Sequence, residues 1–284
     1  MHESITPADL AIPLRDLHFS QNVSKRARWW HGGDPVPTAF FNALSCTFPA
    51  GEKFFMDAVR AFRGDVGEPL LAQIKGFIAQ ESVHSREHRA FNQLASDSGY
   101  AIEPLEARTK RILDRARTRS KIEQLAATCA LEHFTAILAH DLLATDSQDM
   151  DDAPIEAARL WSWHAMEEIE HKAVAYDTFM EVTRSWSGLR RYLLRTRAMF
   201  LATLILIATV GANMRSLYQQ DGLRGFRIWR RTLVYLLFRP GPLARIFPNY
   251  MSYYKPGFHP WQHDDRELLA KTAAALELMG PAAA

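Results

Sequence analysis

The sequence predicts an all-α protein, a four-helix bundle with additional C-terminal helices. Apolar residues recur along most of the chain at the three- to four-residue spacing of a single helix face. No alternating polar and apolar run, Asn-Gly hairpin or repeated strand–helix–strand rhythm indicates a sheet. With 284 residues, of which 48% are hydrophobic, the chain can fill the core of one large domain.

The N-terminal part of the chain leads into the bundle. Residues 1–37 are expected to form a mostly irregular segment that packs its tryptophans on the bundle, because RARWWHGGDPVPT contains Gly-Gly and two prolines. The first helical region is expected at residues 38–63 with a break near Pro49, since proline suits the first turn of a new helix. The second helix is expected at residues 68–97.

Two further long helices complete the predicted bundle, which spans residues 38–184. A polar, Arg-rich helical link at 103–120 leads to the third long helix at 121–144. Pro154 marks the expected start of the fourth helix, which continues to about residue 184.

The fourth of these helices contains the densest group of metal-binding residue types. In WSWHAMEEIEHKAVAYD, His164, Glu168 and His171 are spaced i, i+4 and i+7. At about 3.6 residues per turn, this spacing places all three on one helix face. That face therefore offers two imidazoles and a carboxylate.

The second helix repeats part of this pattern. Glu81 and His84 form a Glu-x-x-His pair in IAQESVHSREHRAFN, and Phe77, His88 and Phe91 continue the same face. We expect the two phenylalanines to belong to the core, and His88 to line the pocket wall or to support the ligands from behind.

Two single glutamates complete a recognisable set. Glu52 lies near the start of the helix after Pro49, and Glu132 lies in the third long helix among small residues such as Cys129 and Ala136. Dinuclear carboxylate sites in bundles take one Glu from each of two helices and a Glu-x-x-His from each of the other two. The chain order matches a ferritin-like bundle and predicts these metal ligands: Glu52, Glu81, His84, Glu132, His164, Glu168 and His171.

Two divalent ions would make this cluster tolerable in a protein interior. Four buried carboxylates without a cation would each cost several kcal/mol in lost solvation. Mixed carboxylate and imidazole ligands suit iron best, with manganese or zinc as alternatives. Glu81 and Glu168, central in the pattern, are expected to bridge the ions. We expect Glu87, Glu167, Glu170 and Lys172, on other helix faces, to be solvated.

The C-terminal part, residues 185–284, is expected to be a basic and apolar helical extension of the same domain. Residues 184–245 contain twelve Arg, no Lys and one Asp, although the whole chain has a net charge of only +2. Residues 198–214 form an uncharged apolar run. We expect a buried fifth helix there. A membrane-surface contact through residues 185–245 and a full membrane span are the alternatives, whereas nucleic acid is not an expected partner.

Cysteine content indicates a reducing compartment. Cys46 and Cys129 both lie in apolar helical surroundings, so free thiols in the cytoplasm are expected rather than a disulfide framework. The first residues do not show a basic stretch followed by an apolar run, so no secretory signal is expected.

Five segments of the chain resemble a known bacterial family, the "predicted metal-dependent hydrolases". They are FFNALSCTFPAGEKFF, FIAQESVHSREHRAFN, ALEHFTAILA, WSWHAMEEIEHKAVAYD and YYKPGFHPW, within residues 25–265. The resemblance implies a metal protein. The local pattern His-x-x-x-Glu-x-x-His is also similar to the fourth-helix motif of the diiron arylamine N-oxygenases, which implies O2 chemistry on an amine.

The predicted pocket favours oxidation over hydrolysis. We expect Phe54, Phe55, Phe77 and Phe91 to line a pocket beside the metals, and such a pocket suits O2 and a hydrophobic or aromatic small molecule. The preferred hypothesis is a non-haem diiron oxygenase or oxidase supplied with electrons by an external donor, since no flavin or iron–sulfur motif is present. A metal-dependent hydrolase that activates water and a non-enzymatic metal-binding or membrane-surface protein are the alternatives. A homodimer formed through the basic C-terminal part is compatible with the sequence, although nothing in the residue spacing requires it.

Overall fold

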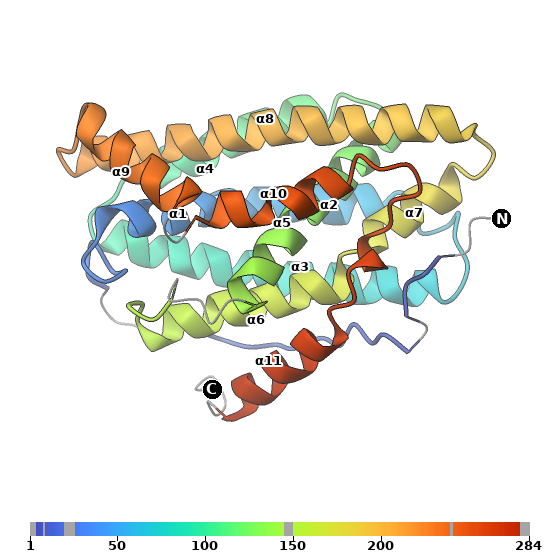
Figure 1. Cartoon of the computed structure of the whole chain (residues 1–284), viewed down its shortest axis with the longest axis horizontal. Coiled ribbons are helices and arrows are strands. Elements are labelled where there is room, and N and C mark those ends of the chain that lie inside the picture. Colours follow the sequence, from blue (N-terminus) through green and yellow to red (C-terminus); the bar gives the residue numbers. More distant parts are fainter. Residues whose placement is uncertain (1–3, 8, 20–25, 145–149, 239–240, 279–284) are drawn as a thin grey trace.

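The computed structural model describes residues 4–7, 9–19, 26–144, 150–238 and 241–278 (Figure 1). Every regular element within these ranges is helical, which confirms the all-α prediction. Part of the predicted lead-in, at residues 1–3, 8 and 20–25, lies outside the described residues.

The helices follow the predicted order with small shifts of their ends. They are α1 Pro35–Ser45, α2 Phe48–Arg60, α3 Leu70–Asp97, α4 Glu103–Ala116, α5 Lys121–Ala144, α6 Ile155–His171, α7 Val174–Val182, α8 Gly188–Gln220, α9 Phe226–Leu237, α10 Pro242–Ser252 and α11 Arg266–Leu278, with a 3-10 turn at Pro260–Gln262. The first region is divided as predicted, and Pro49 lies in the first turn of α2.

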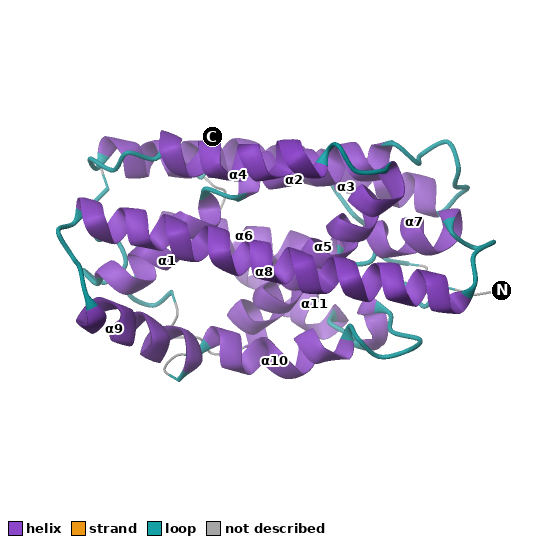
Figure 2. Ribbon diagram, turned by 90° about the horizontal axis from the view of Figure 1, so that it is seen from above, coloured by secondary structure: helices purple, strands orange, loops and turns teal. Residues whose placement is uncertain are grey.

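Four long helices bring the predicted ligands together. α2 packs on α3, α5 packs on α6, and the two pairs meet where α2 contacts α5 and α3 contacts α6 (Figures 1 and 2). Large apolar side chains such as Phe54, Phe77, Leu125 and Trp163 are almost fully buried between them. This core holds the helices in a fixed register, and the candidate site lies inside it.

The predicted fourth helix is divided in two. α6 ends at His171 and α7 begins at Val174, so the expected continuous helix from Pro154 to residue 184 is interrupted. At the interruption, the ammonium group of Lys172 donates to the carbonyl of His263 at 2.8 Å and to the carboxylate of Asp265 at 2.5 Å. The break therefore occurs where the C-terminal tail binds the helix.

The longest helix, α8, covers one side of the bundle but leaves its outer face uncovered. Its inner face packs on α1 and α5 and buries Met199, Met214 and Leu217. Only 22% of its most apolar 18-residue window is buried, and by length and composition alone the helix could cross a membrane. The expectation of a fully buried fifth helix at residues 198–214 is therefore wrong for the outer half of the helix.

The C-terminal tail returns to the bundle. Tyr253, Phe258 and Trp261 are buried, and buried Arg195 of α8 donates to the carbonyl oxygens of Tyr253 and Lys255. At the other end of the chain, Trp30 is buried at 4% exposure, as expected for the lead-in segment, whereas Trp29 is 37% exposed.

Candidate metal centre

The predicted ligands lie together in the interior. All seven are 5% exposed or less. Single donor atoms of Glu81, His84, Glu168 and His171 lie within 4.8 Å of one another, and those of Glu52, His88 and His164 form a second such group. Glu132 lies outside both groups, and His88, which we expected in a supporting position, lies within one of them.

His84 stands between two consecutive glutamates of α6. Its Nε2 lies 3.0 Å from Glu167 Oε2, and its Nδ1 lies 3.7 Å from Glu168 Oε1 and 3.9 Å from Glu81 Oε2. Glu167 already accepts hydrogen bonds from Arg15 and Trp163, which fix its position. It therefore accepts a further hydrogen bond from the N–H at Nε2 of His84. The unprotonated Nδ1 of His84 therefore points at two carboxylates, and it has no hydrogen-bond partner among the described residues.

His171 is oriented in the same way from the other side. Its Nδ1 lies 3.1 Å from Glu132 Oε2, while its Nε2 lies 3.5 Å from Glu81 Oε1 and 3.8 Å from Glu168 Oε1. A carboxylate behind an imidazole is the usual means of aiming the opposite nitrogen at a metal. In this arrangement Glu132 holds His171 through one oxygen, and its other oxygen, Oε1, is buried without a partner among the described residues.

A chain of polar side chains sets the proton positions behind His164. Asn92 donates through Nδ2 to Glu106 at 2.7 Å, so its Oδ1 faces Ser45 and accepts from the Ser45 hydroxyl at 2.7 Å. With the hydroxyl proton used in this way, Ser45 Oγ accepts from Nδ1 of His88, 2.9 Å away. Burial lowers the pKa of His88 well below its usual value, so the ring has a single proton.

This arrangement turns Nδ1 of His164 toward His88 and Nε2 of the same ring into the site. His88 Nε2 can only accept a hydrogen bond, so the N–H at Nδ1 of His164 donates to it over 2.6 Å. Nε2 of His164 then faces Glu168 Oε1 at 2.8 Å and Glu52 Oε1 at 3.9 Å. An imidazole lone pair facing a carboxylate is repulsive unless a proton or a metal cation is shared between them.

Burial and crowding explain the charge state of the site without a cation. Burial raises the pKa of Glu52 and of Glu81 well above the usual value, and the neighbouring carboxylates raise both further. Burial lowers the pKa of His171, but Glu168 and Glu132 outweigh this effect and raise it to about 9. Without a cation, protons bound to Glu52, Glu81 and His171 therefore reduce the negative charge of the site.

The donor atoms without partners show that the residues fit metal ions. Buried polar atoms that have no hydrogen-bond partner among the described residues include Glu52 Oε1, both carboxylate oxygens of Glu81, His84 Nδ1, Glu132 Oε1 and His171 Nε2. Native proteins rarely leave such atoms unsatisfied. These six atoms belong to residues predicted as ligands, although some such atoms, for example Gln80 Oε1 and Thr109 Oγ1, lie elsewhere. Carboxylate oxygens with imidazole nitrogens form a donor set that accepts iron, manganese or zinc.

Four charged residues near the site do not lie where the sequence pattern placed them. Glu87, Glu167, Glu170 and Lys172 were expected to be solvated, yet all are buried, at 0–7% exposure. Their partners come from distant segments. Arg15 binds Glu167 and Glu170, the backbone N–H of Phe19 donates to Glu87, and Asp265 binds Lys172. No signal in the α6 or α3 sequence itself could have revealed these partners.

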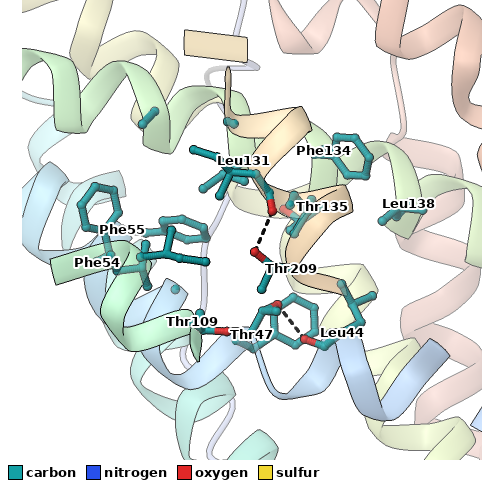
Figure 3. A pocket seen from close by; sticks show the side chains of 18 of the residues that line it. Leu44, Thr47, Phe54, Phe55, Thr109, Leu131, Phe134, Thr135, Leu138 and Thr209 are labelled. Atoms are coloured by element: carbon teal, nitrogen blue, oxygen red, sulfur yellow. Dashed lines mark hydrogen bonds between the residues drawn. The ribbon is translucent and has the colours of Figure 1, made fainter. Parts of the chain in front are cut away.

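A large apolar cavity leads to the centre. It has a volume of about 680 Å³ and reaches His164 and Glu168, and this size falls in the range of small-molecule sites. In Figure 3, Phe54 and Phe55 of α2 face Leu131, Phe134 and Leu138 of α5 across this space. The hydroxyl of Thr135, which also lines the cavity, donates to Glu168 Oε2.

The cavity lining differs in part from the prediction. Phe54 and Phe55 line it as expected, but Phe77 and Phe91 are packed elsewhere in the core. Phe77 lies against the ring of His171, with ring centroids 4.9 Å apart, and so supports a predicted ligand instead of the pocket.

Comparison with protein families identifies the group to which the chain is related. The model of a family described as "predicted metal-dependent hydrolase" matches residues 13–264. The chain belongs to the predicted metal-dependent hydrolase family. Comparison with curated proteins and with solved structures gave no match. The family region covers residues 13–264, so it includes both groups of donor residues, the cavity and the outer helices α8 to α10.

Proposed function

We propose that the chain is a metal-dependent enzyme with a dinuclear centre in a ferritin-like bundle, acting on a hydrophobic small molecule. The observation that carries the proposal is the convergence of one imidazole nitrogen from each of His84, His164 and His171 on the buried carboxylates Glu81 and Glu168. The proposed ligands are six of the seven residues predicted from the sequence, Glu52, Glu81, His84, His164, Glu168 and His171, whereas Glu132 orients His171 through its Oε2.

Glu168 has the central position among these residues. Its Oε1 lies within 4 Å of nitrogens of His84, His164 and His171. A carboxylate in contact with ligands from both groups is suited to bridge two ions, and Glu81, which approaches His84 and His171, is the second candidate bridge. Thr135 holds the other oxygen of Glu168 and so limits its rotation.

Hydrolysis is the reaction that the family description supports. Bound divalent ions would supply Lewis acidity, which activates water and polarises a substrate carbonyl or phosphoryl oxygen. The chain provides the surroundings. The apolar cavity binds the hydrophobic part of the substrate, and His164 and Glu168 lie at its inner end, where the reactive bond would be placed. On this account, the family description favours the hydrolytic alternative over the diiron oxygenase preferred from the sequence.

Oxidation by O2 is a second candidate because of one structural observation. Most of the side chains that line the cavity beside the centre are apolar, and they come from α1, α2, α4, α5, α6 and α8, although Arg108, Arg119 and Glu123 are among the lining residues. An apolar cavity suits O2 and an unactivated hydrophobic substrate, and the donor set suits iron or manganese. This reaction would need an external electron donor.

Metal analysis combined with two assays separates the candidates. The purified protein should contain about two metal ions per chain, as the ligand set of a dinuclear site implies. Cleavage of hydrophobic esters by the zinc- or manganese-loaded protein, with no O2 consumption, would support hydrolysis. Consumption of O2 by the iron-loaded protein with a chemical reductant and a hydrophobic amine would support oxidation.

Variants of the same protein test the ligand assignment. His171→Ala and Glu168→Ala should each lower the bound metal, whereas His263→Ala, which removes an exposed imidazole on the tail, should not. Unchanged metal content in both site variants would contradict the assignment, whichever reaction the enzyme catalyses.

A further inference from the structure

The outer face of α8 forms a continuous apolar stripe. Its members are spaced so that they fall on one line along the helix at 100° per residue, and each is 51–67% exposed. They are Leu189, Leu193, Phe200, Leu204 and Ile207. Figure 1 shows α8 along one edge of the molecule, and Figure 2 shows no helix in front of its outer side. A stripe of this length is unusual on a surface that meets only water.

Positive charge accompanies the stripe. Arg190, Arg197 and Arg215 are exposed and lie on the flank of the stripe on the same helix. In the following helix α9, exposed Arg227, Arg230 and Arg231 alternate with Phe226, Leu233 and Leu237, which are 42–80% exposed. Asp221 in this region is occupied by Arg28 and Trp29. Glu123 pairs with Arg197, and Asp34 pairs with Arg231, so Arg190, Arg215, Arg227 and Arg230 carry the charge that is available to a partner. The surface is therefore apolar and strongly basic together.

The cavity opens beside this stripe. Leu201 and Ile205 of α8 line the cavity, and they are also 46% and 48% exposed. Leu194, Ala198 and Leu206 continue the same wall toward the interior. An apolar path thus leads from the outer edge of α8 to His164 and Glu168.

We propose that the outer face of α8, together with α9, docks on an anionic lipid bilayer and lies flat in its interface. Leu, Phe and Ile side chains would enter the acyl boundary, and the arginines would bind lipid phosphates. A hydrophobic substrate could then pass from the bilayer into the cavity. The docking itself is independent of the reaction, whereas the delivery of substrate rests on the proposed function.

The structure disfavours a span by α8. Its inner face is part of the folded core: Asn213 accepts from Arg108 and donates to the carbonyl of Ala43, and Arg195 binds the C-terminal tail. Withdrawing these buried polar groups into lipid would cost several kcal/mol each. Only the outer half of the helix is available to the membrane.

A second copy of the chain is a less suitable occupant of the stripe. A two-fold interface places the same patch of each subunit face to face. The exposed arginines of α8 would then approach those of the partner, and like charges at an interface are repulsive. Anionic lipid provides the opposite charge.

Vesicle binding tests the proposal on the full-length protein. We expect co-sedimentation with vesicles of equal parts phosphatidylcholine and phosphatidylglycerol, weaker binding at high salt, and little binding to phosphatidylcholine alone. Combining Leu193→Ser, Phe200→Ser and Leu204→Ser should weaken binding by at least about tenfold. The matched control combines Ile5→Ser, Leu14→Ser and Ile155→Ser, three exposed aliphatic residues outside α8, and should bind like the unaltered protein.

The alternative outcomes are distinct. Failure to bind anionic vesicles, or binding that the α8 substitutions leave unchanged, would overturn the proposal. Loss of a dimer in the α8 variant, with vesicle binding unaffected, would assign the stripe to a second copy instead. Arg190→Gln with Arg215→Gln provides a second variant that leaves the stripe intact, and it should weaken binding to anionic vesicles only. Metal content is measured in parallel, so a failure of the metal assignment is recognised separately.

Discussion

Glu167 and Glu168, adjacent in α6, approach opposite nitrogens of the same imidazole, that of His84. Glu167 lies 3.0 Å from Nε2, and Glu168 lies 3.7 Å from Nδ1. Arg15 and Trp163 hold Glu167 in place. The ring is therefore fixed from behind by one carboxylate, and its free nitrogen is directed at the next.

The first prediction concerns this support. Glu167→Gln removes the negative charge behind His84 but keeps the size of the side chain, so His84 should be a weaker ligand. Metal affinity should fall by roughly 10- to 100-fold, as expected for the loss of a carboxylate that orients a ligating histidine. The measurement is competition for the metal with a chelator. The control is Glu181→Gln in α7, where the glutamate side chain is 40% exposed. Equal metal affinities in the two variants would exclude the positioning role.

The second prediction concerns the chain of hydrogen bonds behind His164. Ser45→Ala removes the acceptor that fixes the proton on His88 Nδ1, so His164 should no longer present Nε2 to the site reliably. Titration with metal should show one of two ions bound more weakly, while the other is little changed. If both ions bind as before, the assignment of these proton positions is wrong.

The third prediction concerns stability after metal removal. In the metal-free protein, burial raises the pKa of Glu52 and Glu81 well above the unfolded value of about 4.3. The folded state therefore binds more protons than the unfolded state above that pH, and its stability must fall as pH rises.

The pH window is set by the histidines. Burial lowers the pKa of His84 and His88, so these two groups make the folded state more stable as pH rises. This contribution ends near the unfolded histidine pKa of about 6.5. From about pH 7 upward, Tm of the chelator-treated protein should decrease with pH, and added metal should reverse the decrease. A metal-free protein whose Tm rises over this range would contradict the assignment of buried carboxylates to the centre.

The fourth prediction concerns the cavity. Leu131→Trp adds a large side chain to a residue that lines the cavity on α5, so binding of a hydrophobic fluorescent probe should weaken while metal content is unchanged. Substituting Leu193 with Trp on the exposed face of α8 provides a control of the same chemistry outside the cavity lining. Equal loss of probe binding in both variants would show that the probe does not report the cavity.

Helical periodicity was sufficient to place the two rows of candidate donors inside the protein, because residue spacing and helix face are local properties. The rows through Glu81 and His84 and through His164, Glu168 and His171 lie inside the protein as their spacing predicts. The prediction that Glu167 and Lys172 are solvated was wrong because their burial depends on contacts with distant parts of the chain. A helix pattern shows which residues share a face, but not that Arg15 or Asp265 will return from a distant part of the chain to cover another face.

The same limit explains α8. Its apolar run predicts burial only if some other element covers the outer side, and no described helix does so. The sequence also could not reveal that Glu132 lies behind His171 instead of beside the other donors, because that distinction depends on a displacement of a few Å between α5 and α6.

Anomalous scattering from crystals of the metal-loaded protein tests the central claim most directly. The account predicts two anomalous peaks per chain, both in contact with Glu168 and lying among Glu52, Glu81, His84, His164 and His171. Peaks elsewhere in the molecule, or none after loading with iron, manganese or zinc, would contradict it.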